Sequence, residues 1–484
     1  MRGATLAAAA TALAALLVAA AGASTGGGLD PSYGNGGIVA TDFGGEYLQS
    51  IAVQQDGKIL AAGGMGSGQV NSGIVIRLDG AGQLDRSFDA DGRVVVARGA
   101  YRGAVAVQRD GKILFAGGTY AFESGGAMSI ALSRYNADGS VDSGFGSGGV
   151  VVTPLPDRYG MPWHVLLPSD GTIVVVGQSW PRASSVMQVV VLRYTRDGRL
   201  DTTFGSGGVT ISDWGPFAAP TGAALSPDGA IVVGGYRSDP DSKNLVSVAE
   251  RLTPDGAPDS SFGSAGIAVT DHEAYSGMGG VAVQADGKVL LAGGTSFSVL
   301  RFTTSGALDT TFGSKGVVSL GSRPFTDESR DVAVQRNGKI LVFGTGAGDG
   351  KREFALKRLL PDGRPDRSFA AALPAVPDNP YPEFVREAPD GKIVAGGWTY
   401  SSGNGPNHGV IFRFLPGTCS VPKLAGTSLA AARTKLAAAN CRVGTIKNVA
   451  SRLPKGKVAG SVPAAGKEAP DWAVVRLTLS RGRP

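Results

Sequence analysis

Arginine and aspartate recur together through most of this sequence, and they are the residues whose types and spacing could do chemistry. An Arg between hydrophobic residues is followed five residues later by Gly, eight later by Asp and eleven later by an aromatic residue. A carboxylate near a guanidinium could bind a polar ligand, but it can also form a bidentate pair that fixes a turn. Because a ligand site is not expected to repeat seven times with identical spacing, we interpret the pairs as structural. They are Arg77–Asp85, Arg134–Asp142, Arg193–Asp201, Arg251–Asp259, Arg301–Asp309, Arg358–Asp366 and, across the two ends of the array, Arg413–Asp30.

Other patterns that could support catalysis or metal binding are weak. His164, His272 and His408 lie in different repeats without the close spacing of metal ligands. Asp89-Ala-Asp91-Gly92 lacks most ligands of a calcium loop, and Asp271-His272-Glu273 is interpreted as a solvated loop. The sequence contains no nucleophile elbow and no phosphate-cradling loop. It therefore predicts no catalytic residues, no cofactor and no metal.

Short strands must position the Arg–Asp pairs. A second marker, an Asx-Gly dipeptide between two apolar runs, is typical of a tight two-residue hairpin. With the Arg-bearing run and a run after the aromatic residue, each unit of roughly 50 to 60 residues contains four strands and no helical signal, which indicates a propeller blade. The aromatic residues are expected to pack between blades. The seven dipeptides are Asp56-Gly57, Asp110-Gly111, Asp170-Gly171, Asp228-Gly229, Asp286-Gly287, Asn337-Gly338 and Asp390-Gly391.

The two ends of the array are complementary halves of one unit. The segment around Asp30 and Tyr33 has the Asp and the aromatic residue without the Arg, whereas the segment around Arg413 has the Arg without the Asp. An open array would expose two apolar faces and a sheet edge. We therefore expect an all-β, seven-bladed propeller of four-stranded blades with three-plus-one closure, in which residues 36–41 complete the blade of residues 383–415. The sixth unit lacks the Gly-rich turn, which weakens the prediction of its fourth strand.

The repeated Leu-Asp-x-x-Phe-Gly-x-x-Gly and Asp-Gly-Lys-Ile patterns resemble the bacterial delta-60 repeat family over residues 29–415. The resemblance implies a β-propeller found in exported and surface proteins, without a general catalytic activity attached to the repeat. It supports a propeller domain over residues 24–417.

The N-terminus is interpreted as a signal peptide over residues 1–23. Met1-Arg2 precedes an Ala/Leu-rich run, and Ala21-Gly22-Ala23 offers a small-residue cleavage site. A retained membrane helix is the alternative. Because no second long apolar run follows, we expect no integral membrane segment after cleavage and a secreted protein, extracellular or associated with the cell wall.

The last part of the chain, residues 418–484, has a different composition. The overall net charge is +6, but from Cys419 onward six Lys and six Arg face two acidic residues, a balance of +10 that leaves −4 for the rest. This distribution argues against nucleic-acid binding by the array and favours a basic module that meets an anionic polymer. Both cysteines, Cys419 and Cys441, lie here, and in an exported protein they are expected to form a disulfide. Between them, Thr427 to Asn440 has the pattern of a helix with Thr427 as its N-cap.

The run Cys-Ser-Val-Pro-Lys-Leu-x-Gly, the Ala/Leu helix, Cys-Arg-Val-Gly and Pro-Lys-Gly-Lys-Val resemble a PASTA domain, an α+β module, over residues 419–482. The resemblance implies a Gram-positive source and contact with peptidoglycan fragments; a basic surface that only keeps the module soluble is the alternative. The residues expected to contact peptidoglycan or an anionic wall polymer are Lys423, Arg433, Lys435, Arg442, Lys447, Arg452, Lys455 and Lys457.

The sequence thus predicts an exported, non-catalytic binding or scaffold protein, whose propeller presents loops to a protein or glycan partner while the module holds the wall. One alternative is a secreted propeller enzyme acting on a glycan. It would require two or more carboxylates without a repeat-equivalent role to converge on one face. The other alternative is a rigid surface spacer.

Overall fold

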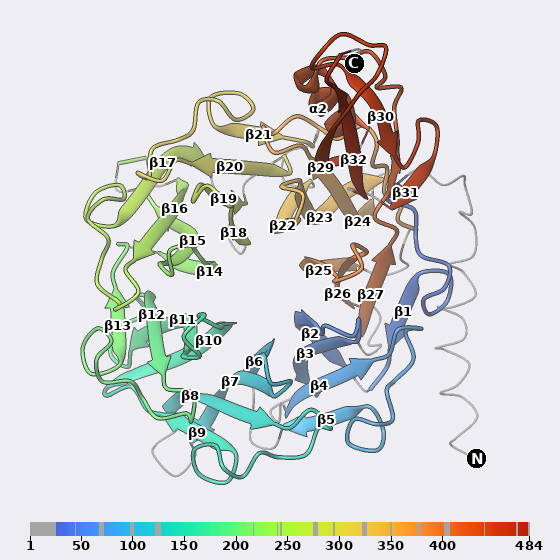
Figure 1. Ribbon diagram of the computed structural model, residues 1–484. Helices are drawn as coiled ribbons and strands as arrows, with labels where there is room; N and C mark the ends of the chain where they lie inside the picture. The colour runs from blue at the N-terminus through green and yellow to red at the C-terminus, as the bar shows by residue number, and fades with distance from the viewer. Residues whose placement is uncertain are drawn as a thin grey trace.

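The chain folds into a ring of seven β-sheets followed by a small separate module (Figure 1). The computed structural model describes residues 26–482 apart from residues 44, 67–71, 97–100, 122–126, 216, 240, 243, 274–278, 294–295, 322–326, 349–350, 375, 377–378, 401–406, 440 and 471–472. The predicted signal peptide lies outside the described residues. Among those described, no helix has the length and apolar character needed to cross a membrane.

Each blade is an antiparallel meander whose first strand lies nearest the centre of the ring (Figure 1). Blades one to three are β2 (Glu46–Val53), β3 (Ile59–Met65), β4 (Ser72–Leu78) and β5 (Arg93–Val96); β6 (Tyr101–Val107), β7 (Ile113–Ala121), β8 (Ala127–Tyr135) and β9 (Val150–Thr153); and β10 (Arg158–Leu166), β11 (Ile173–Pro181), β12 (Gln188–Tyr194) and β13 (Val209–Ser212). Blades four to seven are β14 (Ala219–Leu225), β15 (Ile231–Ser238), β16 (Leu245–Leu252) and β17 (Ile267–Glu273); β18 (Val281–Val283), β19 (Val289–Ala292), β20 (Ser298–Phe302) and β21 (Val317–Ser319); β22 (Glu328–Val334), β23 (Ile340–Gly348) and β24 (Lys351–Leu359); and β25 (Asn379–Glu387), β26 (Ile393–Tyr400), β27 (His408–Phe414) and β1 (Ile38–Thr41).

The predicted three-plus-one closure is confirmed. Strand β1, from the beginning of the array, pairs antiparallel with β27, from its end, in the register Ile38↔Phe412 to Thr41↔Gly409. Blade seven also packs against blade one, where Phe384 and Ile411 share a buried cluster with Ile59. The ring is therefore sealed by both strand pairing and apolar contact.

Blade six differs from the prediction. Within the described residues its sheet has three strands, β22-β23-β24, and not four. The residues after Phe369 lack the Gly-rich turn that reverses the chain in the other blades. The N-terminal segment lies there instead, because Gly26 forms a parallel bridge with Phe369 and accepts a hydrogen bond of 2.9 Å from Ala370 N–H.

The Asx-Gly turns also differ in type from the prediction. In the turn at Asp56-Gly57 only Gly57 has a positive φ, of 85°, and the closing hydrogen bond runs from Gln54 N–H to the Lys58 carbonyl. The loop is thus longer than two residues. The Asp56 side chain accepts a hydrogen bond from Lys58 N–H at 3.1 Å, which explains why an Asx residue recurs at this position.

The repeated aromatic residues lie between blades. Tyr33, Phe88, Phe145, Phe204, Phe262 and Phe312 are fully buried. In the turn of the following blade, a glycine leaves space for the ring: a Cβ at Gly198 would overlap Phe145, and one at Gly256 would overlap Phe204. These glycines are the Gly of the Arg-Gly-Asp-aromatic frame, so the frame couples each blade to the next.

The C-terminal module consists of β28 (Thr418–Ser420), helix α2 (Leu429–Ala438), β29 (Cys441–Val449), β30 (Val458–Val462), β31 (Glu468–Pro470) and β32 (Ala473–Ser480). The predicted disulfide is present between Cys419 and Cys441. The N-cap is Ser428 and not Thr427: the Ser428 hydroxyl accepts a hydrogen bond from Ala431 N–H at 3.2 Å, whereas the Thr427 hydroxyl donates to the Leu424 carbonyl.

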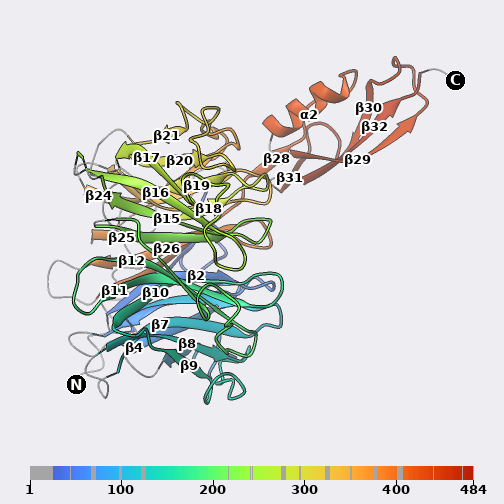
Figure 2. The same ribbon diagram turned by 90° about the vertical axis from the view of Figure 1, so that its left-hand side faces the viewer.

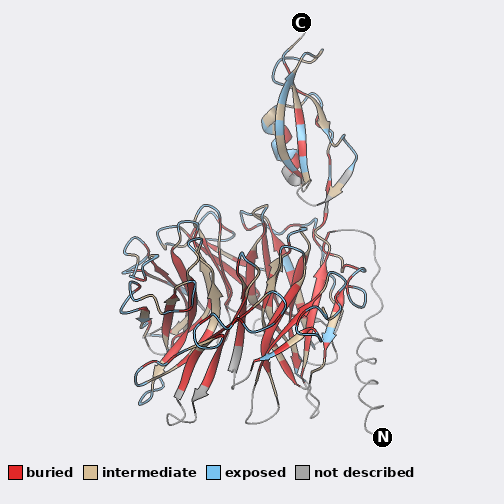
Figure 3. Ribbon diagram, turned by 60° about the horizontal axis from the view of Figure 1, so that its bottom comes forward, coloured by how far each residue is buried: buried red, intermediate tan, exposed pale blue. Residues whose placement is uncertain are grey.

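The propeller has two different faces. The face that carries the Asx-Gly turns and the Arg–Asp pairs is called the clasp face. The opposite face, where the innermost strand of each blade begins, is called the loop face. The chain leaves blade seven at Pro416, whose carbonyl accepts a hydrogen bond from Arg358. The module therefore stands on the clasp face, as Figures 2 and 3 show.

Candidate functional site

The Arg–Asp pairs join each blade's third strand to the turn that follows it. The distance from the Arg Nε to the Asp Oδ2 is 2.7 Å for Arg77–Asp85, 2.6 Å for Arg134–Asp142, 2.8 Å for Arg193–Asp201, 2.6 Å for Arg251–Asp259, 2.9 Å for Arg301–Asp309, 2.8 Å for Arg358–Asp366 and 2.8 Å for Arg413–Asp30. The prediction that each arginine binds its aspartate through two nitrogens is wrong. The aspartate is bound through Nε, and a second guanidinium nitrogen binds another group.

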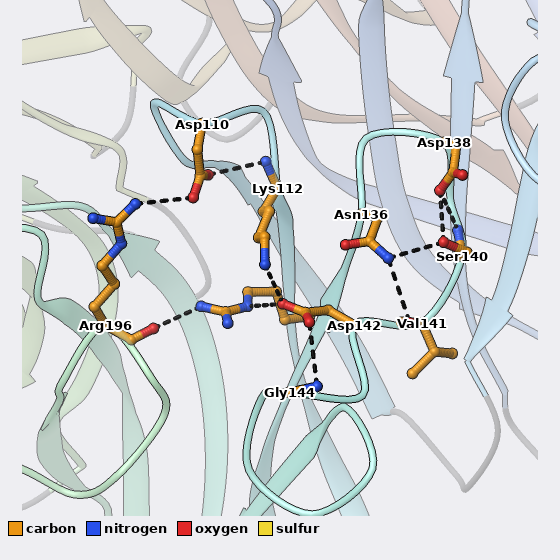
Figure 4. A network of polar contacts seen from close by, with 10 residues as sticks. Asp110, Lys112, Asn136, Asp138, Ser140, Val141, Asp142, Gly144 and Arg196 are labelled. Atoms are coloured by element: carbon orange, nitrogen blue, oxygen red, sulfur yellow. Dashed lines mark hydrogen bonds and ion pairs between the residues drawn. The ribbon is translucent and has the colours of Figure 1, made fainter.

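That second nitrogen reaches the next blade. Arg134 Nη1 donates to the carbonyl of Arg196 at 2.6 Å, and Arg413 Nη1 donates to the carbonyl of Gly80 at 2.8 Å. Figure 4 shows blade two, where Lys112 adds a second cation to Asp142 at 2.7 Å and Arg196 contacts Asp110. The pairs are therefore part of an inter-blade clasp, and their polar atoms are occupied by the fold.

The electrostatics of the clasp agree with a structural role. Burial opposes ionisation at all seven aspartates, but hydrogen bonds from neighbouring residues and the nearby cations outweigh it and lower the pKa of each. At Asp30 these hydrogen bonds, from Ser32 and Lys392, and the charge of Arg413 outweigh burial and lower the pKa to about 2. Carboxylates that are ionised near neutral pH and paired in this way stabilise turns.

A different set of residues lines the centre of the ring. In six blades the innermost strand has a β-bulge, with register shifts at Leu48/Ser50, Tyr101/Gly103, Pro162/His164, Pro220/Gly222, Ser329/Asp331 and Pro382/Phe384. A bulge inserts one unpaired residue and re-aims its side chain. The inserted residues include Gln49, Trp163, Thr221, Arg330 and Glu383, and all five line one cavity.

The recurring glycine of the second strand explains the bulge. A Cβ at Gly63 would overlap the carbonyl oxygen of Tyr47, and a Cβ at Gly397 would overlap that of Tyr381. In both cases the bulged innermost strand presses its carbonyl against the position where a side chain would begin. The close approach of the two backbones at this glycine therefore gives room for the bulge.

The cavity has a volume of about 280 Å³ and is walled by residues of all seven blades. Its polar and aromatic lining differs from blade to blade at equivalent positions, unlike the clasp. The lining residues are Gln49, Ser50, Gly103, Pro162, Trp163, His164, Thr221, Gly279, Gly280, Arg330, Asp331, Tyr381, Glu383, Phe384, Arg386 and Trp398. A concave site with a few convergent polar groups is the usual form of a small-molecule or substrate site.

Glu383 is held by an aromatic group in blade seven. The indole N–H of Trp398 donates to Glu383 Oε1 at 3.1 Å. The indole ring is stacked on Tyr381, with ring centroids 4.0 Å apart and an interplanar angle of 4°, and Tyr47 of blade one meets it edge-on at 4.8 Å. The Glu383 carboxylate is therefore oriented by a rigid ring that is itself fixed from two blades.

Asp331 is the second carboxylate of the cavity. Its Oδ2 accepts hydrogen bonds from Val385 N–H at 2.8 Å and from Arg386 Nη1 at 2.6 Å, and its Oδ1 accepts one from Val332 N–H at 2.9 Å. The Asp331 side chain is only 8% exposed, whereas that of Arg386 is 42% exposed. Asp331 is thus a fixed, charge-paired carboxylate, and part of Arg386 faces the open space.

His164 contributes an uncharged ring. Its Nε2 lies 3.2 Å from the carbonyl oxygen of Thr221, which can only accept, so Nε2 carries the proton and Nδ1 keeps its lone pair. Burial lowers the pKa of His164, although the hydrogen bond to Thr221 favours the charged form. The imidazole is therefore neutral near pH 7. Of the other histidines, His408 lies on β27, and the side chain of His272 lies outside the part of the chain that is described.

The sequence carried a signal for this site that motif searching misses. The bulge position reads Gln49, Trp163, Thr221, Arg330 and Glu383 in units that otherwise repeat one another. Divergence in chemistry at a structurally equivalent position is what a shared central site requires. Locating the position needed the bulge, which no short motif in the sequence marks.

The eight residues expected to contact the wall all lie on the module. Lys423, Arg433, Lys435, Arg442, Lys447, Arg452 and Lys455 are exposed, and Lys457 is partly buried. They are distributed over the helix, β29 and the connecting turns and do not form one cluster with the channel. No group of His, Cys, Asp and Glu able to hold a metal is found among the described residues.

Family comparisons agree with the two-part architecture. The family model described as "Domain of unknown function (DUF5122) beta-propeller" matches residues 54–88, 108–145, 169–204, 226–262, 284–312, 335–369 and 388–417, one match for each blade. The PASTA domain model matches residues 420–481. The chain therefore carries DUF5122 β-propeller repeats and a C-terminal PASTA domain. No curated protein sequence matches it.

Several solved propeller structures are similar to this one. The polysaccharide lyase Uly1 has a TM-score of 0.42 at 12% identity, over 84% of this chain and 95% of that one. The α-L-arabinofuranosidase Arb93A of Fusarium graminearum has a TM-score of 0.42 at 10% identity, over 65% of this chain and 93% of that one. The α-L-arabinanase of Penicillium chrysogenum has a TM-score of 0.38 at 11% identity, over 65% and 93%. At these values the likeness is one of fold.

The prediction of a non-catalytic binding or scaffold protein is wrong. Solved structures of similar fold include glycoside hydrolases and a polysaccharide lyase, a likeness that concerns the fold alone. Glu383 and Asp331 both line the channel without a repeat-equivalent role, which is the condition that the alternative, a propeller enzyme acting on a glycan, required. The prediction failed because it relied on contiguous motifs, whereas this site takes residues from every blade.

Proposed function

We propose that this chain, which carries DUF5122 β-propeller repeats and a PASTA domain, is an exported enzyme that cleaves glycosidic bonds in the central channel. One observation carries the proposal: the strand bulges direct chemically different side chains, Glu383 and Trp163 among them, into a single cavity that Asp331, Tyr381 and Trp398 also line. Aromatic faces with carboxylates suit a polyhydroxylated ring, because C–H groups pack on the aromatic faces and hydroxyls bond to the polar groups.

The two carboxylates differ in environment and therefore in role. Glycosidases act with one carboxyl group that exchanges a proton with the glycosidic oxygen and a second that attacks, activates water or stabilises positive charge. Glu383, which accepts a hydrogen bond from the uncharged Trp398 indole, is assigned the proton-transfer role. Asp331, whose oxygens accept hydrogen bonds from Arg386 and two backbone N–H groups, is assigned the second role. The neutral His164 can bond to a sugar hydroxyl without adding charge.

The direct test is turnover by the full chain on a panel of glycans. The panel contains chitohexaose, linear arabinohexaose, hexagalacturonate and purified peptidoglycan, and new reducing ends or unsaturated products are measured. Glu383→Gln is expected to lower the rate by about 10²–10⁴-fold, the contribution typical of a general acid or base. Glu353→Gln, on β24 of the neighbouring blade, is the matched control and is expected to be as active as the wild type. Equal activity of the two variants would contradict the assignment of Glu383.

The cellular context is proposed from the other parts of the chain. The disulfide and the PASTA domain are typical of an extracellular or wall setting. We infer that residues 1–23 act as a signal peptide, that the repeats are of the delta-60 type in a Gram-positive bacterium, and that the basic residues of the module contact peptidoglycan or an anionic polymer.

Co-sedimentation of the full chain with sacculi over a salt series tests the contact between the module and the wall. Replacing Lys435, Arg442 and Lys447 by Glu is expected to release the protein at lower salt.

A further inference from the structure

The shape of the channel restricts which part of a glycan can reach Glu383. The cavity is not a groove across the surface: residues of all seven blades surround it, so it is walled on every side. A polysaccharide lying along the loop face would have to leave that face and enter the ring to reach the carboxylates. This restriction on the substrate rests on the proposed function, because it concerns the same site.

The depth of the site is set by the strands. Glu383 lies four residues after Asn379, where β25 begins, and Trp163 lies five residues after Arg158, where β10 begins. At about 3.3 Å per residue, these side chains leave their strands about 13 to 16 Å below the level at which the innermost strands start. Gln49, three residues after the start of β2, lies about 10 Å below that level. The cavity is thus well inside the ring.

The volume of the site gives a second constraint. At about 280 Å³ the cavity is at the lower limit of the roughly 300–1,000 Å³ of small-molecule sites. It is too small for a chain that enters, turns and leaves by the same mouth. A chain that passed through the ring would also have to enter by an end. Both routes therefore require a free terminus.

We propose that the channel accepts only the end of a glycan chain, so that the protein is an exo-acting enzyme on free termini. The terminal unit occupies the space between Trp163, Tyr381 and Glu383, and the rest of the glycan chain extends out of the ring.

Protection of an engineered thiol in the channel tests this inference with or without turnover. Gln49→Cys places a thiol in the cavity wall, and Ala183→Cys places one on the exposed turn after β11, on the loop face outside the channel. Both substitutions are made in the full chain, which has no free cysteine among its described residues. The rate of alkylation by iodoacetamide is measured with chitohexaose, arabinohexaose or hexagalacturonate, each free and each capped at both ends with a bulky aromatic group.

The expected result is at least fivefold slower alkylation of the Gln49→Cys variant by one free hexasaccharide, no protection by its capped form, and no effect on the Ala183→Cys variant. Equal protection by free and capped forms would overturn the chain-end inference and leave the glycan site standing. No protection of the channel thiol by any hexasaccharide at millimolar concentration would count against the proposed function, and the chain-end inference would fall with it. A rapid fall in polymer mass during turnover would show internal cleavage and would also overturn it.

Discussion

At the scale of single residues, the contact between Trp398 and Glu383 is the one by which the fold orients the proposed catalytic carboxylate. The indole makes a hydrogen bond of 3.1 Å to the carboxylate and is itself held by Tyr381 and Tyr47. Five other blades have no tryptophan at this place: the matching residues are Gly64, Thr119, Gln178, Tyr236 and Thr345 in blades one, two, three, four and six. Its presence beside the one glutamate of the bulge positions indicates a positioning residue.

Trp398→Phe removes the N–H group but keeps an aromatic ring between Tyr381 and Tyr47. Because a hydrogen bond to a charged group contributes about 1.5–3 kcal/mol, we expect kcat/KM to fall about tenfold or more. The donated hydrogen bond favours the ionised carboxylate, so its loss is expected to move the limb of the pH–rate profile that reports Glu383 to higher pH. Trp180→Phe, on β11 outside the cavity, is the control. A lower rate with an unmoved pH profile would reduce Trp398 to a packing role.

At the scale of elements, the bulge and the glycine opposite it form one device. Gly397→Ala is expected to force the carbonyl of Tyr381 away and to flatten the bulge that presents Glu383, because a Cβ would overlap that oxygen. Overpacking of this kind costs about 1–3 kcal/mol, so the melting temperature should drop by a few degrees while kcat falls more steeply than stability. Gly80→Ala, where a Cβ meets nothing within 4 Å, is the matched control, and thermal unfolding with parallel kinetics is the measurement. If the Gly397→Ala variant were less stable but kept its full kcat, the glycine would have no role in shaping the site.

The elements also show what the sequence could and could not predict. The Arg-Gly-Asp-aromatic frame recurs in every unit, so the blades, their number and their closure can be predicted from it. Within the described residues, the sheet of blade six has no fourth strand. This is the blade in which the frame itself fails, after Phe369. The site depends on the differences between repeats: Glu383 follows Pro382 in a strand whose alternation gives no hint that one residue is inserted and turned inward. Periodicity reveals what units share, and this site consists of what they do not share.

At the scale of the whole molecule, the ring is held by seven clasps, and the seventh joins the two ends of the array. Asp30 is 2% exposed and contacts both Arg413, at 2.8 Å, and Lys392, at 3.1 Å. Within the described part of the chain, Asp201 in blade three is paired with Arg193 alone among the basic residues, since Thr172 stands where blade seven has Lys392. The clasp at Asp30 therefore contains one more cation than the clasp at Asp201. Breaking it would release the first and the last segment of the array at the same time.

The pH dependence of stability is determined by these carboxylates. Their folded-state pKa values lie below the unfolded value of 3.8, with Asp30 at about 2, so the stabilisation is present above about pH 4 and is lost as the pH falls toward 2. Through the clasps, thermal unfolding of the full chain should therefore shift to lower temperature below pH 4. Asp30→Asn leaves Arg413 and Lys392 without their carboxylate, which should cost about 3–5 kcal/mol at pH 6. The difference from the wild type should shrink at pH 2, where Asp30 is itself half protonated. Asp241→Asn, on an exposed turn, should follow the wild type throughout; if Asp30→Asn did so as well, the ring would be held closed by strand pairing and apolar packing without help from its last clasp.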